Sequence, residues 1–248
     1  MRRLLPDPGE TTVERQLDGY RPWEEAGEDR PRVAMNFAAT LDGRATIEGR
    51  SGQIGSATDT AMLVGLRTRF DAVMIGAGTM RAERYGRIVS DPAKRERRER
   101  LGLSADPLVV IVSGRLDLPW DAPLFTEAGG PVLVFTAAED EEPPAVAPPL
   151  QLIRHQGQVE MTAVLRHLRR ERGIRALLCE GGPRLHSQLW SLGLVDELFL
   201  TMAPKLTGAG PSILEGELPA VTQRELAWLL EDGGELFGRY RRAPTAID

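Results

Sequence analysis

One pattern occurs twice in this chain: an apolar run ends in a glycine turn and is followed by a segment with helical spacing. The first copy contains Gly76-Ala77-Gly78-Thr79, and the second contains Glu180-Gly181-Gly182 followed by Pro183. A continuous apolar run is typical of a strand that is buried on both faces of a parallel sheet. Glycine lets the backbone approach a ligand, and the helix that follows offers N–H groups and a positive dipole end to an anion. Each turn alone is equally consistent with an ordinary connection, but the pair favours binding of a nucleotide cofactor.

Strands and helices alternate along most of the chain, which predicts an α/β fold with a central, largely parallel mixed sheet flanked by helices. Two β-type segments on either side of Asp232-Gly233-Gly234 predict an antiparallel hairpin at one edge of this sheet. The expected strands are 33–39, 72–75, 108–112, 131–135, 176–180, 197–202, 224–230 and 235–241, and the expected helices are 56–69, 159–172 and 183–192.

Length and charge limit the domain organisation and the type of ligand. The chain has 248 residues, of which 42% are hydrophobic, and this suits one α/β domain over 32–248. Residues 1–31 are rich in proline, glycine and charge, so we expect an extension that lies over the domain. A net charge of -5 argues against a general nucleic-acid binder. A small molecule is the expected ligand.

Cysteine and histidine usage points away from disulfides and metals. Cys179 is the only cysteine, which excludes an intramolecular disulfide and fits a reducing cytoplasm. The three histidines lack metal-ligand spacing, so no metal site is expected. No apolar stretch approaches the length that crosses a membrane, and a cytoplasmic location is therefore expected.

Two common nucleotide-binding motifs do not occur. A Rossmann dinucleotide site requires Gly-x-Gly-x-x-Gly, and the segment from Gly76 to Arg81 lacks the third glycine. The chain also contains no Gly-x-x-x-x-Gly-Lys-Ser/Thr. The glycine turns therefore predict a nucleotide site of another architecture.

Several motifs in a fixed order resemble those of the riboflavin-pathway pyrimidine reductases, which share the dihydrofolate-reductase-like fold. The resemblance covers most of residues 32–215 and implies a homodimeric, NADPH-dependent reductase. Its implied reaction converts 5-amino-6-(5-phosphoribosylamino)uracil to the ribitylamino product by hydride transfer to C1′ of the ring-opened ribose. The motifs that carry it are Thr40-Leu41-Asp42-Gly43, Gly76-Ala77-Gly78-Thr79, Glu180-Gly181-Gly182, Val195-Asp196-Glu197-Leu198 and Ala203-Pro204-Lys205 with Gly208 and Gly210.

The resemblance also implies roles for individual residues. Ser113 and Arg115 are expected at the adenosine 2′-phosphate, where a guanidinium pairs with phosphate and favours NADPH over NADH. Glu180 and Asp42 are the catalytic candidates, with an ordered water as a further source of the proton. The other expected cofactor contacts are Gly76, Gly78, Thr79, Gly181, Gly182 and Pro183, and the expected substrate contacts are Asn36, Thr40, Ser56, Asp59, Glu83 and Arg87.

Some of these roles have structural alternatives. Asn36 is polar within an apolar strand and needs either a ligand or an internal partner. Asp42 precedes glycine and equally suits an Asx-turn. Asn36 stands where many family members have lysine, and the segment Arg81 to Arg87 lacks the usual Asp-x-Pro sequence. The pocket could therefore accept another substrate.

Two other functions are compatible with this sequence. A pteridine such as dihydrofolate would need one carboxylate, from Glu83 or Glu180, whereas a ribityl phosphate would need cations such as Arg81, Arg84, Arg87 or Lys205. A non-catalytic NADPH-binding regulator would bind the cofactor without oxidising it. The zinc-deaminase signature that often precedes this reductase domain does not occur in the sequence, so we expect deamination to be performed elsewhere.

Overall fold

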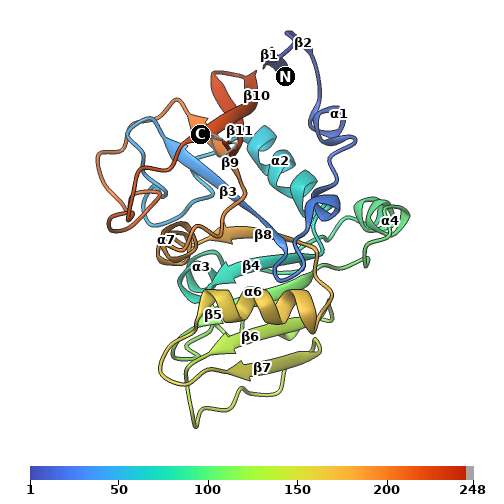
Figure 1. The fold of residues 1–248 in the computed structure, drawn as a ribbon, viewed down its shortest axis with the longest axis vertical. Coiled ribbons are helices and arrows are strands. Elements are labelled where there is room, and N and C mark those ends of the chain that lie inside the picture. Colours follow the sequence, from blue (N-terminus) through green and yellow to red (C-terminus); the bar gives the residue numbers. More distant parts are fainter. Residues whose placement is uncertain (244–248) are drawn as a thin grey trace.

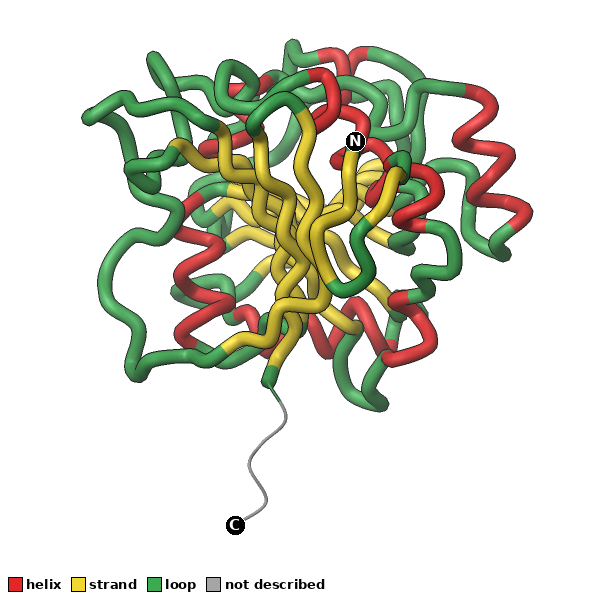
Figure 2. The backbone as a smooth tube through the Cα atoms, turned by 90° about the horizontal axis from the view of Figure 1, so that it is seen from above, coloured by secondary structure: helices red, strands yellow, loops and turns green. Residues whose placement is uncertain are grey.

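The computed structural model describes residues 1–243 and shows one twisted sheet with helices on both faces (Figures 1 and 2). The strands are β1 (Arg2–Leu5), β2 (Gly9–Glu10), β3 (Arg32–Thr40), β4 (Ala72–Gly76), β5 (Leu108–Ser113), β6 (Val132–Thr136), β7 (Leu150–Arg154), β8 (Ala176–Gly181), β9 (Glu197–Ala203), β10 (Arg224–Asp232) and β11 (Glu235–Arg242). The helices are α1 (Val13–Leu17), the 3-10 helix η1 (Pro22–Glu25), α2 (Ala57–Arg67), α3 (Ala77–Glu83), α4 (Pro92–Arg100), α5 (Pro123–Thr126), α6 (Met161–Arg170) and α7 (Pro183–Ser191).

The sheet combines a parallel part and an antiparallel part. Its strand order within the described residues is β2-β1-β10-β11-β9-β3-β8-β4-β5-β6-β7. Neighbouring strands from β9 to β7 run parallel. The remaining pairs, β9–β11, β11–β10, β10–β1 and β1–β2, are antiparallel. All five residues of β4 are buried, as its continuous apolar sequence predicts. The predicted α/β fold with a largely parallel sheet and an antiparallel hairpin at β10 and β11 is confirmed.

Two apolar layers cover the two faces of the parallel strands. On one face, Met62 of α2 and Met80 of α3 pack over Val73 and Ile75 of β4. On the other face, α6 and α7 pack over the alternate residues of the same strands. Ser56 caps α2 because its side chain accepts hydrogen bonds from the backbone N–H groups of Thr58 and Asp59.

The N-terminal segment belongs to the same sheet, which the sequence did not indicate. The strands β1 and β2 extend the antiparallel edge beyond β10, and Val13 and Leu17 of α1 are buried in the core next to α2. Residues 1–31 therefore do more than lie over the domain. The short elements α1, η1, α5, β1, β2 and β7 have no strong periodic signal and were absent from the sequence prediction.

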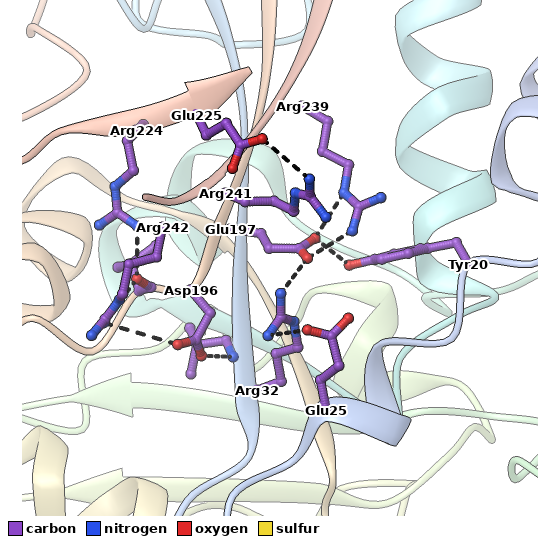
Figure 3. Close-up of polar contacts among 12 residues, drawn as sticks. Tyr20, Glu25, Arg32, Asp196, Glu197, Arg224, Glu225, Arg239, Arg241 and Arg242 are labelled. Carbon is purple, nitrogen blue, oxygen red and sulfur yellow. Dashed lines mark hydrogen bonds and ion pairs between the residues drawn. The ribbon is translucent and has the colours of Figure 1, made fainter. Parts of the chain in front are cut away.

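A buried ionic network attaches this segment to the sheet (Figure 3). Glu197 of β9 is fully buried and accepts hydrogen bonds from Arg239 of β11, Arg32 of β3 and the Tyr20 hydroxyl. Burial alone would raise the pKa of Glu197, but its hydrogen bonds and charge pairing with Arg239 and Arg32 outweigh that effect and lower it. The network fixes the amino-terminal ends of the central strands.

Candidate active site

The helices that follow the adjacent parallel strands β4 and β8 lie on opposite faces of the sheet. The helix after β4, α3, packs on one face of the sheet through Met80, whereas α7 after β8 packs on the opposite face through Leu185. Helices that leave neighbouring strands toward opposite faces open a crevice outside the carboxyl ends of those strands. In Figure 1 this edge lies at the left, where α3 and α7 are drawn.

The two glycine turns meet in this crevice. A Cβ atom at Gly76 would lie 3.2 Å from the backbone nitrogen of Gly182, and one at Gly182 would lie 2.7 Å from Oγ1 of Thr79. Gly181 has a φ of +142° and the same close neighbour, Thr79. The turns are therefore packed backbone to backbone and have no room for a side chain. Gly78 is exposed beside them at the start of α3.

Asp42 closes the loop that follows β3. Its Oδ1 accepts a hydrogen bond from the Thr40 hydroxyl at 2.6 Å, and its Oδ2 accepts one from the Gly208 N–H at 2.7 Å. These two hydrogen bonds lower the pKa of Asp42. Lys205 joins the same group of loops by donating to the carbonyl oxygens of Gln53 and Ile54, each at 2.8 Å. Thr40 and Asp42 thus lie at the carboxyl edge, and they connect loops that are far apart in the sequence.

Glu180 is held by an arginine that sequence reasoning did not identify. Nε and Nη2 of Arg67, the last residue of α2, donate to the two carboxylate oxygens at 2.7 and 2.6 Å. The Glu180 side chain is only 2% exposed, and the Arg67 guanidinium also lies 5.6 Å from the ring centre of Tyr85. No local sequence pattern links positions 67 and 180, because only the packing of α2 on the sheet brings them together.

Asn36 and Asp59 lie near the same carboxyl edge, on the face covered by α2. Asn36 of β3 is half-buried, and its side-chain amide makes no hydrogen bond within residues 1–243. Ser56 donates to the buried Glu235 at 2.5 Å. Burial raises the pKa of Asp59, with Thr201 opposing and the charge of Glu235 adding to the rise. The start of α2 thus brings two carboxyl groups together, of which sequence reasoning identified only Asp59.

A cavity of about 320 Å³ lies outside the ends of β5 and β6. Arg115, which was expected at the adenosine 2′-phosphate of a cofactor, is one of its lining residues. Ser113 is 3% exposed, and the lining comes instead from the flanking Val112 and Gly114. Sequence reasoning missed the other polar residues of the lining, Gln158 and Gln188.

Two residues that were expected to contact the substrate, Arg87 and Glu83, make hydrogen bonds to other residues of the protein. Arg87 donates to both carboxylate oxygens of Asp106, which lies just before the amino-terminal end of β5. This places the Arg87 guanidinium at the end of the sheet opposite the glycine turns. The Glu83 carboxylate accepts hydrogen bonds from the backbone N–H and hydroxyl of Ser51.

Residues 1–243 contain no group of three His, Cys, Asp or Glu side chains that could hold a metal ion. Among the helices in this part of the chain, none is long and apolar enough to cross a membrane.

The fold and the crevice define an α/β protein with a candidate ligand site at the carboxyl edge of a parallel sheet, where glycine turns from two adjacent strands meet. A family model, the RibD C-terminal domain, matches residues 31–235. The chain belongs to this family, and the family resemblance stated from its motifs is confirmed.

Individual relatives agree with this assignment. The chain is 34% identical over 193 residues to the 2,5-diamino-6-ribosylamino-4(3H)-pyrimidinone 5′-phosphate reductase of Archaeoglobus fulgidus, and the match covers 76% of this chain and 88% of that protein. It is 29% identical to the riboflavin biosynthesis protein RibD of Aquifex aeolicus over 75% of this chain and 50% of the relative. A crystal structure of a pyrimidine reductase-like protein from Corynebacterium diphtheriae superposes with a TM-score of 0.78 at 26% identity, covering 95% of this chain and all of that one.

Proposed function

We propose that this protein is an NADPH-dependent reductase of riboflavin biosynthesis that acts on a phosphoribosylamino-pyrimidine. The observation that carries the proposal is the contact between the two glycine turns at the β4–β8 crevice, within a chain segment that matches the RibD C-terminal domain. The names of the relatives support the reaction class, because they are reductases of ribosylamino-pyrimidines.

The residues at the crevice fit a nicotinamide dinucleotide. The glycine turns bring bare backbone to the surface between α3 and α7, where a pyrophosphate can approach. The cavity beside Arg115 has the size and polarity for an adenosine group, with Gln158 and Gln188 as hydrogen-bonding side chains. Arg115 is exposed and free to pair with a 2′-phosphate. When bound, the cofactor supplies the hydride.

The protein's own contribution is alignment of the two reactants. Holding reacting groups in the correct geometry can contribute about 7 to 11 kcal/mol in favourable cases. Arg67 fixes the Glu180 carboxylate at the end of β8, where it can accept a hydrogen bond from a hydroxyl or amino group of the substrate. Asn36 has an unengaged amide on the same face and can bind the pyrimidine.

The source of the proton is a second part of this proposal. Asp42 has a lowered pKa and accepts hydrogen bonds from Thr40 and Gly208, so it suits a structural role. The pKa of Asp59 is raised, and its neighbour Glu235 disfavours a second negative charge. We therefore assign the proton-holding role to Asp59 in preference to Asp42.

The direct experiment compares NADPH oxidation by the purified protein with three substrates under matched conditions. These are the uracil form and the 2,5-diamino form of the phosphoribosylamino-pyrimidine, and dihydrofolate. Faster turnover of either pyrimidine is the expected result, and the preferred pyrimidine indicates whether reduction follows or precedes deamination. Preference for dihydrofolate would reject the proposed substrate, and cofactor binding without oxidation of NADPH would reject the proposed activity.

Asp59 can be tested in the same assay. The D59N variant should have lower turnover than the wild type at all pH values, and its residual kcat/KM profile should lack the high-pH limb. D42N, in contrast, should retain that limb. A D59N profile with the wild-type shape would exclude Asp59 as the proton source.

A further inference from the structure

A cluster of three arginines lies at the opposite end of the sheet from the glycine turns. Arg69 follows α2 just before the amino-terminal end of β4, Arg97 belongs to α4, and Arg21 precedes η1. In Figure 1, α4 lies at the right, on the side of the molecule away from α3 and α7. This cluster is therefore separate from the proposed reductase site.

Arg69 is buried without the hydrogen bonds that a buried guanidinium requires. Its side chain is 1% exposed, and within residues 1–243 its buried Nε and Nη2 atoms have no hydrogen-bond partner. Nη1 of Arg21 is likewise buried without a partner. Buried charged groups in proteins are normally paired and hydrogen-bonded. Within residues 1–243 these buried donors of both arginines therefore still require an acceptor.

Asp18 is the carboxylate that approaches the cluster, and it does so at long range. The same oxygen, Oδ1, lies 3.8 Å from Nη2 of Arg69 and 3.6 Å from Nη2 of Arg97. Neither distance is a hydrogen bond, and the Asp18 side chain is 77% exposed. Burial lowers the pKa of Arg69 to about 10, and the positive charges of Arg97 and Arg21 add to that effect. The negative charge of Asp18 acts in the opposite direction but does not offset the lowering of the Arg69 pKa.

We propose that Arg21, Arg69 and Arg97 form a binding site for a phosphate group. Three guanidinium groups against one carboxylate leave an excess of two positive charges, which matches a phosphate dianion. Guanidinium groups bind phosphate through paired N–H donors, and this geometry suits the free donors of Arg69 and Arg21. The source is either inorganic phosphate or the phosphomonoester of a small metabolite. The site acts as a regulatory or stabilising site, because it lies away from the reaction crevice.

Thermal unfolding of the full chain tests this site without any measurement of turnover. Inorganic phosphate is titrated against sodium chloride at matched ionic strength, with glycerol 3-phosphate in a parallel series. A ligand that binds the folded state stabilises it in a saturable manner. We expect Tm to rise by roughly 5 to 10 °C at a hundredfold excess of ligand over Kd. Saturation by glycerol 3-phosphate at lower concentration would identify the phosphomonoester as the source.

Variants locate the response. In R69M the rise in Tm with phosphate should disappear, whereas Tm in chloride should equal or exceed that of the wild type because a buried charge without hydrogen-bond partners has been removed. R97Q is a second variant at a more exposed position and should reduce the response. R184M removes a 91% exposed arginine and should retain the full response.

Two results would overturn the proposal. Equal effects of phosphate and chloride at matched ionic strength would indicate charge screening alone. A phosphate response that persists in R69M and R97Q but is lost in R115M would place the anion at the cavity beside Arg115.

Discussion

At the scale of single residues, the site depends on partners that only folding supplies. Glu180 and Arg67 are 113 positions apart and form a two-pronged ion pair, and both side chains are largely buried. A buried ion pair contributes little relative to a well-packed apolar pair, but removal of one partner leaves an uncompensated charge and costs much more. Removal of either Glu180 or Arg67 should therefore lower the stability of the fold strongly.

The R67M variant tests this sensitivity. The free energy of unfolding should fall by about 3 to 5 kcal/mol, because the Glu180 carboxylate stays buried without its cation. R100M is the matched control, since the Arg100–Glu96 pair has both side chains more than 65% exposed and should change stability by less than about 1 kcal/mol. Urea unfolding measures both variants. Equal losses would show that burial of the Glu180 pair has no special energetic effect.

The glycine turns give a second prediction at this scale. In G182A the new Cβ would lie 2.7 Å from Oγ1 of Thr79, so the turn must move, and both stability and NADPH affinity should fall. The double variant G182A/T79A removes the clashing atom and should recover stability. A Cβ added at Gly52 would have no neighbour within 4 Å, so G52A serves as the control. Failure of T79A to restore any stability would refute this steric account.

At the scale of secondary-structure elements, the N-terminal segment is attached to the central strands through Glu197. Tyr20 donates to Oε2 of this carboxylate at 2.7 Å, and the guanidinium of Arg239 lies 4.4 Å from the Tyr20 ring centre. The lowered pKa of Glu197 means that the folded state binds its proton less readily than the unfolded state does. Its contribution to stability is present above the unfolded pKa of 4.5 and is lost as pH falls through the folded value.

The E197Q variant should therefore show a pH-dependent loss of stability. At pH 7 the free energy of unfolding should fall by about 3 to 5 kcal/mol, because Arg32 and Arg239 lose a buried counter-charge. The difference from wild type should begin to shrink as pH drops below 4.5, where the carboxylate of the unfolded state becomes protonated, and should vanish once pH falls below the lower pKa of the folded state. E225Q alters a 51% exposed carboxylate in the same region and serves as the control (Figure 3). A difference that stays constant down to pH 3 would contradict the assignment.

At the scale of the whole molecule, residues 1–31 support the helix that carries part of the site. A Cβ at Gly65 of α2 would lie 2.8 Å from Leu17 and 3.0 Å from Val13, so α1 and α2 are in close contact. The helix α2 presents Asp59 and Arg67 toward the sheet. Loss of α1 should therefore affect both stability and the site.

Deletion of residues 1–30 should lower Tm and raise the KM for the pyrimidine. Each fully buried apolar side chain, such as Val13 or Leu17, contributes about 1.5 to 3 kcal/mol. Deletion of residues 1–10 removes β1 and β2 but keeps α1, and it should leave KM nearly unchanged. Calorimetry and steady-state kinetics measure the two effects. An unchanged KM in the longer deletion would separate the N-terminal segment from the site.

Much of the fold was predictable because its signals are local. The apolar run of β4 and the Ser56 cap of α2 specify their elements through neighbours in the sequence. The strand β7 was missed because its sequence is short and half-exposed. Arg87 was expected near the substrate from a segment that resembles the family only weakly, whereas the structure pairs it with Asp106.

The sequence by itself determined the strand–glycine–helix units and their parallel arrangement, because backbone conformation and the burial of apolar runs follow from local residue types. Only the tertiary structure decided which turns meet, which carboxylates are paired and, within residues 1–243, which buried arginine donors lack a hydrogen-bond partner. No local sequence pattern predicts that residues 67 and 180 lie together, or that residues 21, 69 and 97 do. Their contacts arise from the order of strands in the sheet and the packing of α1, α2 and α4 against it.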